Sequence, residues 1–351
     1  MVTIDELLIL SKERRASDLH ITVGIPPKIR VNGELIDLDY PRILPSDSEK
    51  MILPLFTDRT RAAFEENGEV DFAYAIPGIG RFRVNVFRQR GSYALVIRLV
   101  GTQIPKAQEL GIPQSVIELT EKKRGLVLVT GPTGSGKSTT LASLIDIINT
   151  NRNAHIITLE DPIEYLHNHK RAVVNQREIG LDTMSYSKAL RSALREDPDV
   201  ILVGEMRDLD TISIAITAAE TGHLVFSTLH TTGAANTIDR IIDVFPPFQQ
   251  QQIRIQLASV LEAIVSQQLI PMQDNSGRVA AFEVLHTTAS IKNLIREAKT
   301  HQIDSTIQTN KKLGMQTMDD AIYDLYLKRK IDAEHAIEYA QDQMSLERKL
   351  F

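Results

Sequence analysis

A glycine-rich run carries the clearest chemistry in this sequence: Gly131, Pro132, Thr133, Gly134, Ser135, Gly136, Lys137, Ser138 and Thr139. Up to Ser138 the run matches the phosphate-binding P-loop pattern at every specified position. Glycines allow backbone N–H groups to turn inward around phosphate oxygens, and the start of a following helix favours negative charge. Lys137 suits the β- and γ-phosphates of a nucleotide, and Ser138 suits Mg²⁺. The run therefore predicts a site for ATP and Mg²⁺.

Two acidic residues follow short apolar runs further along the chain. Glu160 ends the run 156–159, and Glu205 comes shortly after the run 200–203. If these runs are parallel strands, their carboxyl ends face the same crevice as the P-loop. An ATPase needs one carboxylate to orient Mg²⁺, directly or through water, and another to activate the attacking water. Either acid alone would more simply be a solvated loop residue, and the spacing leaves open which acid takes which role.

Two histidines bracket a third apolar run, 224–229. His223 precedes the run and His230 follows it. A residue at the carboxyl end of such a strand could sense hydrolysis at the γ-phosphate, whereas two separated histidines without cysteine make a weak metal signal. If the histidines stood alone, surface or core positions without a chemical role would be favoured.

Five arginines and no acid occur between Ile79 and Arg98: Arg81, Arg83, Arg88, Arg90 and Arg98. Arg81 and Arg83 lie two residues apart, which places them on one face of a strand. Three interpretations are open: a solvated sheet face, arginine fingers that reach a nucleotide in a neighbouring subunit, or a nucleic-acid patch. The net charge of −5 and the lack of tryptophan count against the nucleic-acid patch.

The elements that must position these side chains form an α/β pattern from Gly125 onward. Short runs that are apolar on both faces alternate with helical segments, which is typical of a parallel sheet covered by helices on each side. The expected strands are 126–129, 155–159, 200–203 and 224–229. The P-loop thus lies between a buried strand and a helical run, a context that favours a phosphate site over an empty turn. After about Thr232 the sequence is mainly helical in character, with Gln249 to Gln252 expected on a helix or at its start.

The first hundred residues predict a smaller α+β domain. A helix near 4–12 precedes strand-like runs, and the pair Asn32-Gly33 is a strong hairpin signal. The expected strands are 18–23, 28–31, 70–75, 81–87 and 93–99, with a helix-favouring segment at 47–64. Prolines and glycines mark a linker. The predicted division is 1–100, linker 101–113, and 114–351, whose C-terminal helical region covers about 232–351.

Composition restricts the class of protein further. A hydrophobic fraction of 42% is typical of folded domains, and the absence of cysteine excludes disulfides, thiol catalysis and cysteine-ligated zinc. No segment reaches the ~18 apolar residues that a membrane-spanning helix needs. The start of the chain has the pattern of an amphipathic helix rather than of a signal peptide. We therefore expect a cytoplasmic protein that reaches a membrane only through a partner.

Taken together, these motifs resemble those of the secretion ATPase superfamily. The matching segments are an N-terminal signature at 16–20 and 24–27, the Walker A run at 131–139, an aspartate box at 157–165, a Walker B region at 195–208 and a histidine box at 221–230. The resemblance implies a RecA-like ATPase core with a parallel-rich sheet, a PAS-like N-terminal domain and C-terminal helices. It also implies a homo-hexamer whose two domains rotate against each other as ATP turns over.

The resemblance assigns roles that the spacing left open. It implies that Glu160 is the general base and that Glu205 positions Mg²⁺ through water. It implies that His230 senses the γ-phosphate and that Arg83 and Arg98 approach the nucleotide. Gly222 stands where many members have histidine, so no role is expected there.

Within the superfamily, the chain looks like the pilus-retraction branch. Pilus-extension and type II secretion ATPases carry a longer N-terminal region and a zinc-binding cysteine cluster, whereas this chain has 351 residues and no cysteine. The segment 290–297 resembles the retraction motif Ala-Ile-Arg-Asn-Leu-Ile-Arg-Glu with two conservative departures. Its residues Ile291, Leu294 and Ile295 would share one helix face.

The resemblance therefore implies a motor that removes pilin from the pilus base. Its expected partners are the pilin machinery and an inner-membrane platform protein, through which it would be peripheral to the inner membrane; no nucleic acid is expected. The alternatives are a nucleic-acid motor with a similar core, the sister pilus-retraction ATPase, and a scaffold that binds nucleotide without hydrolysis. The intact pair of Glu160 and Glu205 counts against the scaffold.

Overall fold

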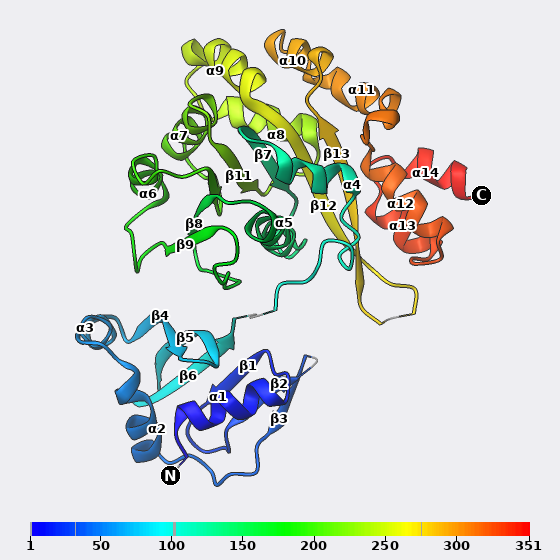
Figure 1. Ribbon diagram of the computed structural model, residues 1–351. Helices are drawn as coiled ribbons and strands as arrows, with labels where there is room; N and C mark the ends of the chain where they lie inside the picture. The colour runs from blue at the N-terminus through cyan, green and yellow to red at the C-terminus, as the bar shows by residue number, and fades with distance from the viewer. Residues whose placement is uncertain (1, 32, 101–102, 275) are drawn as a thin grey trace. The chain divides into compact units, whose positions relative to one another are not determined.

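The computed structural model describes residues 2–31, 33–100, 103–274 and 276–351 (Figure 1). The chain divides into two compact units, Met1–Gln103 with Glu164–Leu166, and Ile104–Ile163 with His167–Phe351. Each unit buries its own hydrophobic core. The linker expected at 101–113 begins with Gly101 and Thr102, which lie outside the described residues.

The first unit contains a six-stranded antiparallel sheet in the order β3-β2-β1-β6-β5-β4. Its strands are β1 (Asp18–Ile21), β2 (Lys28–Val31), β3 (Glu34–Asp37), β4 (Glu69–Ile76), β5 (Gly80–Gln89) and β6 (Ser92–Leu99). Its helices are α1 (Ile4–Glu13), α2 (Pro45–Ile52), the 3₁₀ turn η1 (Leu53–Leu55) and α3 (Asp58–Asn67). The expected hairpin is formed by β2 and β3, with Val31 opposite Glu34. Asn32 itself lies outside the described residues.

The second unit contains a seven-stranded sheet in the order β13-β12-β7-β11-β10-β8-β9 (Figure 1). Its strands are β7 (Gly125–Thr130), β8 (His155–Glu160), β9 (Val173–Glu178), β10 (Val200–Val203), β11 (Leu224–Leu229), β12 (Leu261–Pro271) and β13 (Arg278–His286). All neighbouring strands run parallel except β12 and β13. The predicted α/β class with a parallel-rich sheet is confirmed.

Helices cover both faces of this sheet because its central strands are apolar on both sides. Leu126 and Leu128 of β7 pack into a core with helices α6 (Tyr186–Ala193), α7 (Leu209–Glu220), α8 (Ala234–Asp243) and α9 (Pro247–Val260). Val127 and Val129 of the same strand pack into a second core with α5 (Lys137–Asn151), α4 (Gln114–Ile117) and the turn η2 (Glu118–Glu121). None of the helices in the described ranges is long and apolar enough to cross a bilayer.

The expectation of mainly helical structure after Thr232 is wrong at β12 and β13. Both strands are largely buried and contain short apolar runs, and such runs cannot be told from a buried helix by their period. The remaining elements are helical: α10 (Ala289–Arg296), η3 (Thr300–Gln302), α11 (Ile303–Thr309), η4 (Lys311–Leu313), α12 (Met318–Leu327), α13 (Ala333–Tyr339) and α14 (Gln343–Leu350). The predicted apolar face of α10 is confirmed, since Ile291 and Ile295 are fully buried and Leu294 packs beside them.

Candidate nucleotide site

The P-loop joins the carboxyl end of β7 to the first turn of α5. Gly131, Gly134 and Gly136 have φ angles of 140°, 80° and 89°, a region that side-chain-bearing residues rarely adopt. A Cβ atom on Gly131 would overlap the backbone oxygen of Gln267, and one on Gly136 would lie 2.9 Å from the Gln267 amide nitrogen. Glycine is therefore required here both for backbone conformation and for close packing against β12.

Lys137 begins α5 and folds across the loop. Its side chain is largely buried, and its Nζ donates hydrogen bonds to the carbonyl oxygens of Gly131 at 2.8 Å and Pro132 at 3.0 Å. Ser138 and Thr139 follow in the first turn of the helix. The Oγ atom of Ser135 is buried and has no hydrogen-bond partner in the part of the chain that the structure describes. A cation, a helix N-terminus and an unsatisfied buried hydroxyl together fit a phosphate ligand.

The strand order brings the other predicted residues to the same edge of the sheet. From β7 the carboxyl ends of β11, β10 and β8 follow one another, and they lead into His230, Glu205 and Glu160 respectively. Because neighbouring strands are spaced by about 4.8 Å, the strand of Glu160 lies roughly 14 Å from β7. The predicted side chains thus form one row beside the P-loop, which is the crevice that open α/β sheets use for ligands.

Glu205 and His230 are joined to the P-loop by side-chain contacts. His230 Nε2 lies 3.1 Å from Glu205 Oε1, and His230 Nδ1 lies 3.4 Å from the hydroxyl of Thr133. With its proton on Nε2, the imidazole would donate to the carboxylate and accept from the hydroxyl. The other oxygen of Glu205 accepts a hydrogen bond from Arg207 Nε at 2.6 Å. The histidine therefore connects the loop to the acid at the end of β10.

Gly204 lets β10 end close to β8. A Cβ atom on Gly204 would lie 2.8 Å from the hydroxyl oxygen of Tyr186 and 3.0 Å from the carbonyl oxygen of Leu159. Thr228 also donates from its hydroxyl to the Gly204 carbonyl at 2.6 Å. Burial raises the pKa of Tyr186, and the nearby charge of Asp161 raises it further. The phenol therefore stays neutral, and the turn that carries Glu205 packs against it.

Glu160 is held by two neighbours that the sequence analysis did not identify. Its Oε1 accepts hydrogen bonds from the hydroxyl of Thr158 at 2.6 Å and from the amide nitrogen of Gln176 at 3.1 Å. Thr158 and Glu160 are two apart on β8, and Gln176 is the β9 partner of Thr158, so the three share one face. The backbone N–H of His167 fixes the Gln176 amide by donating to its oxygen at 2.8 Å. In the sequence, the two-residue spacing of Thr158 and Glu160 on a predicted strand was the feature that could have indicated this contact.

Arg83 and Arg98 are direct cross-strand partners on β5 and β6 of the first unit. Like charges in this position repel each other unless they are compensated. Arg98 Nε lies 2.9 Å from Asp18, which is nearly buried, and Arg83 Nε lies 3.6 Å from Asp71. Both guanidinium groups remain about half exposed or more, so they are available to a further anion.

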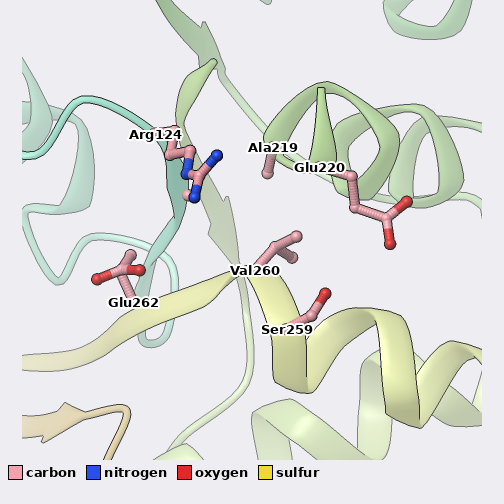
Figure 2. A pocket seen from close by; sticks show the side chains of 7 residues that line it. Arg124, Ala219, Glu220, Ser259, Val260 and Glu262 are labelled. Carbon is pink, nitrogen blue, oxygen red and sulfur yellow. The ribbon is translucent and has the colours of Figure 1, made fainter. Parts of the chain in front are cut away.

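His223 lies at the amino end of β11, whereas His230 follows its carboxyl end. Its Nδ1 is 2.9 Å from the carbonyl oxygen of Ala218 at the end of α7. A pocket of about 360 Å³ opens at the same amino end of the sheet (Figure 2). It is lined by Arg124, Gly125, Ala219, Glu220, Ser259, Val260 and Glu262. Since Gly125 begins β7 and the P-loop follows its last residue, this pocket is separate from the nucleotide site.

Comparison with known proteins identifies relatives along nearly the whole chain. A family model described as "Type II/IV secretion system protein" matches residues 71–329. The chain is 49% identical over 338 residues to the type IV pilus retraction ATPase PilT of Pseudomonas aeruginosa, covering 96% of this chain and 98% of that one. It is 42% identical to the type IV pilus ATPase PilU of the same organism, covering 97% and 90%. A crystal structure of the pilus retraction motor PilT with bound ADP superposes with a TM-score of 0.93 at 51% identity, covering 99% and 100%.

Proposed function

Because the chain belongs to the type II/IV secretion system protein family, we propose that it is the ATP-hydrolysing motor that retracts type IV pili. The observation that carries this proposal is the row of P-loop, His230, Glu205 and Glu160 along consecutive strand ends. The likeness to a retraction ATPase extends over 96% of the chain, and the identity to PilT exceeds that to PilU. We take 1–100 as the PAS-like domain, 101–113 as the linker and 114–351 as the RecA-like ATPase domain.

In this proposal, the P-loop and Lys137 bind the phosphates of ATP. The lysine exchanges its hydrogen bonds with the loop carbonyls for the β- and γ-phosphate oxygens. Ser138 and, through water, Glu205 would hold Mg²⁺, which when bound offsets negative charge on the phosphates. Glu160 accepts a proton from the attacking water. Thr158 and Gln176 restrict its carboxylate to one orientation, which prepares it for that role.

His230 reports the state of the γ-phosphate in this proposal because it bridges Thr133 of the loop and Glu205. Arg83 and Arg98 supply positive charge to the nucleotide, and their ion pairs with Asp71 and Asp18 keep them oriented until then. Arg83→Ala is expected to lower the hydrolysis rate while ATP binding persists. If binding is lost as well, a structural role is the better account.

The motor acts as a homo-hexamer in this proposal and docks on the inner-membrane platform protein of the pilus from the cytoplasmic side. It engages the pilin machinery, and nucleic acid has no part in its cycle. The relatives named as pilus ATPases support the link to the pilus machinery. Ring assembly can be measured by light scattering of the purified chain with and without nucleotide.

The proposal is tested by deleting the gene and scoring pili and surface motility, together with phosphate release by the purified protein. We expect hyperpiliated cells without twitching motility, and ATPase activity that DNA does not stimulate. Loss of pili would instead indicate an extension role, and strong stimulation by DNA would indicate a nucleic-acid motor. Complementation with Glu160→Gln separates the need for hydrolysis from the need for the folded protein.

A further inference from the structure

The segment that follows His230 is anchored by two buried side chains of the sheet. Only 231–233 separates this histidine from the first residue of α8. The backbone N–H of Gly233 donates to Ser266 Oγ at 3.1 Å, and that of Ala234 donates to Glu283 Oε1 at 2.7 Å. Ser266 and Glu283 are register partners on β12 and β13, and both are almost completely buried. The start of α8 is therefore fixed to this strand pair.

The same carboxylate also holds the C-terminal helices. Glu283 Oε2 accepts a hydrogen bond from the side-chain amide of Gln341 at 3.3 Å. The backbone N–H of Met318, the first residue of α12, is a further donor to Glu283. Asp319 of α12 in turn accepts a hydrogen bond from the backbone N–H of Gln341 at 2.7 Å. The Glu283 side chain thus joins the start of α8 to α12 and to Gln341, the residue that leads towards α14. Helices α12 and α14 lie on the β13 side of the sheet (Figure 1).

The chemistry of Glu283 is unusual for a residue that only fills space. Its side chain is 1% exposed, and within the described residues its hydrogen bonds come from backbone N–H groups and an amide side chain rather than from lysine or arginine. Burial raises its pKa, and its N–H donors oppose that shift. Placing an unpaired carboxylate in the interior costs several kcal/mol, and an apolar side chain is often at least as stable there. Its two oxygens, however, hold two separate segments at once, the start of α8 and the segment at Gln341.

We propose that Glu283 is a positioning residue that couples the nucleotide site to α12, α13 and α14. The inference rests on the function proposed above and names a route by which that site acts on the rest of the chain. When His230 changes its contacts with Glu205 and Thr133, the short segment behind it displaces the start of α8. Glu283 transmits that displacement to Met318 and Gln341, because it is hydrogen-bonded to all three segments.

The test is hydrogen–deuterium exchange on the full chain with and without ADP, in the wild type and in Glu283→Gln. In the wild type we expect ADP to change exchange in the P-loop and in residues 318–350. Glutamine keeps the size of the glutamate side chain. It replaces one carboxylate oxygen by an NH₂ group, which cannot accept a hydrogen bond from the N–H groups on that side. Glu283→Gln should keep the change in the P-loop and lose it in 318–350. Its kcat should fall about tenfold while KM for ATP stays within about twofold.

Gln316→Ala is the matched control. The Gln316 amide donates to the Phe282 carbonyl at 2.7 Å, so it also links β13 to the segment before α12; within the described residues its hydrogen bonds run to β13 and not to α8. This variant should lose thermal stability and keep the exchange response of 318–350. If it loses that response as fully as Glu283→Gln does, the link is general packing and the proposal is wrong.

Two further outcomes are decisive. A Glu283→Gln variant that keeps the ADP response of 318–350 overturns the coupling. Should that variant fail to fold, Gln341→Ala removes only one arm of Glu283 and is expected to lose the response in 343–350, and a full response there overturns the proposal equally. The readout uses ADP binding alone. A wild type that binds ADP without hydrolysing ATP would therefore refute the proposed motor and still decide the coupling.

Discussion

The two ends of the seven-stranded sheet have opposite electrostatic character. At the carboxyl end, the N-terminus of α5 and Lys137 face the loop between β7 and the helix. At the amino end, α7 and α9 terminate at Glu220 and Val260, so two helix C-termini with partial negative charge face the pocket of Figure 2. The helix dipoles therefore favour an anion at the carboxyl end and disfavour one at the amino end.

The two acidic side chains that line the pocket at the amino end also have local partners. Glu262 pairs with Lys122 at 2.9 Å, and Glu220 accepts a hydrogen bond from Gln256 at 3.2 Å. At the carboxyl end, by contrast, Glu205 and His230 belong to a set of contacts that includes the P-loop. The comparison shows that residue type alone does not identify a site in a parallel sheet. A residue can belong to the nucleotide site only if it lies at the carboxyl end of its strand.

The largest expected difference between the two ends is that of the lysines. Lys137→Ala removes the side-chain cation of the loop, and we expect phosphate release to fall by about three orders of magnitude or more. Lys122→Ala, at the amino end, should leave the rate within about twofold, because its half-exposed ion pair contributes little. Steady-state phosphate release measures both. Equal losses would show that the cation acts through stability.

The acids should show the next largest difference. Glu160→Gln and Glu205→Gln are each expected to lower kcat by about 10²–10³-fold while ATP still binds, since the carboxylates act on water and on Mg²⁺. Glu262→Gln is the matched change at the amino end and should leave kcat unchanged. Turnover and nucleotide affinity measured in parallel check this. Normal turnover in Glu205→Gln would refute the assignment of that site.

The histidines of β11 provide a smaller contrast within one strand. His230→Ala should lower kcat about tenfold, because it removes the bridge between Thr133 and Glu205. His223→Ala removes a contact with the end of α7, and we expect no change in kcat and a loss of about 1 kcal/mol in the free energy of unfolding. Chemical denaturation and turnover distinguish the two. An equal effect on kcat would remove the distinction between the strand ends.

Much of the site's framework was predictable because it depends on local patterns. The apolar runs of β7, β8, β10 and β11 predicted parallel strands, and the P-loop pattern placed a turn with positive φ angles at its glycines. The spacing of acids after these runs predicted side chains at the carboxyl ends. Each of these inferences needs only a few neighbouring residues.

The residues that hold the site were not predictable because they come from distant segments. Gln267 of β12 packs against the P-loop, and its amide oxygen accepts a hydrogen bond from the hydroxyl of Thr140 at 2.7 Å. The sequence patterns, however, predicted a helical segment where β12 lies. Gln176 reaches Glu160 only because β9 pairs beside β8. Strand order is not encoded in any short window, so sequence patterns identify the reacting groups before they identify the groups that orient them.

The smallest predicted effect concerns the acid sensitivity of the carboxyl end. His167, whose backbone orients Gln176 beside Glu160, has a partly buried side chain, and its buried Nδ1 finds no hydrogen-bond partner among the described residues. Burial lowers the pKa of this imidazole to about 4, against an ordinary value near 6.5. Between these two values the unfolded chain binds more protons than the folded chain. The free energy of unfolding therefore falls as the pH is lowered through this window.

We expect this group to contribute a loss of about 1 kcal/mol between pH 7 and pH 5.5, because the dependence of a single group approaches about 1.4 kcal/mol per pH unit. His167→Gln removes the titrating side chain and leaves the backbone bond to Gln176. Urea unfolding of both proteins at a series of pH values measures the difference. A flatter pH dependence in the variant would assign the acid sensitivity to this loop. Parallel curves would mean that the imidazole is already solvated in the folded protein.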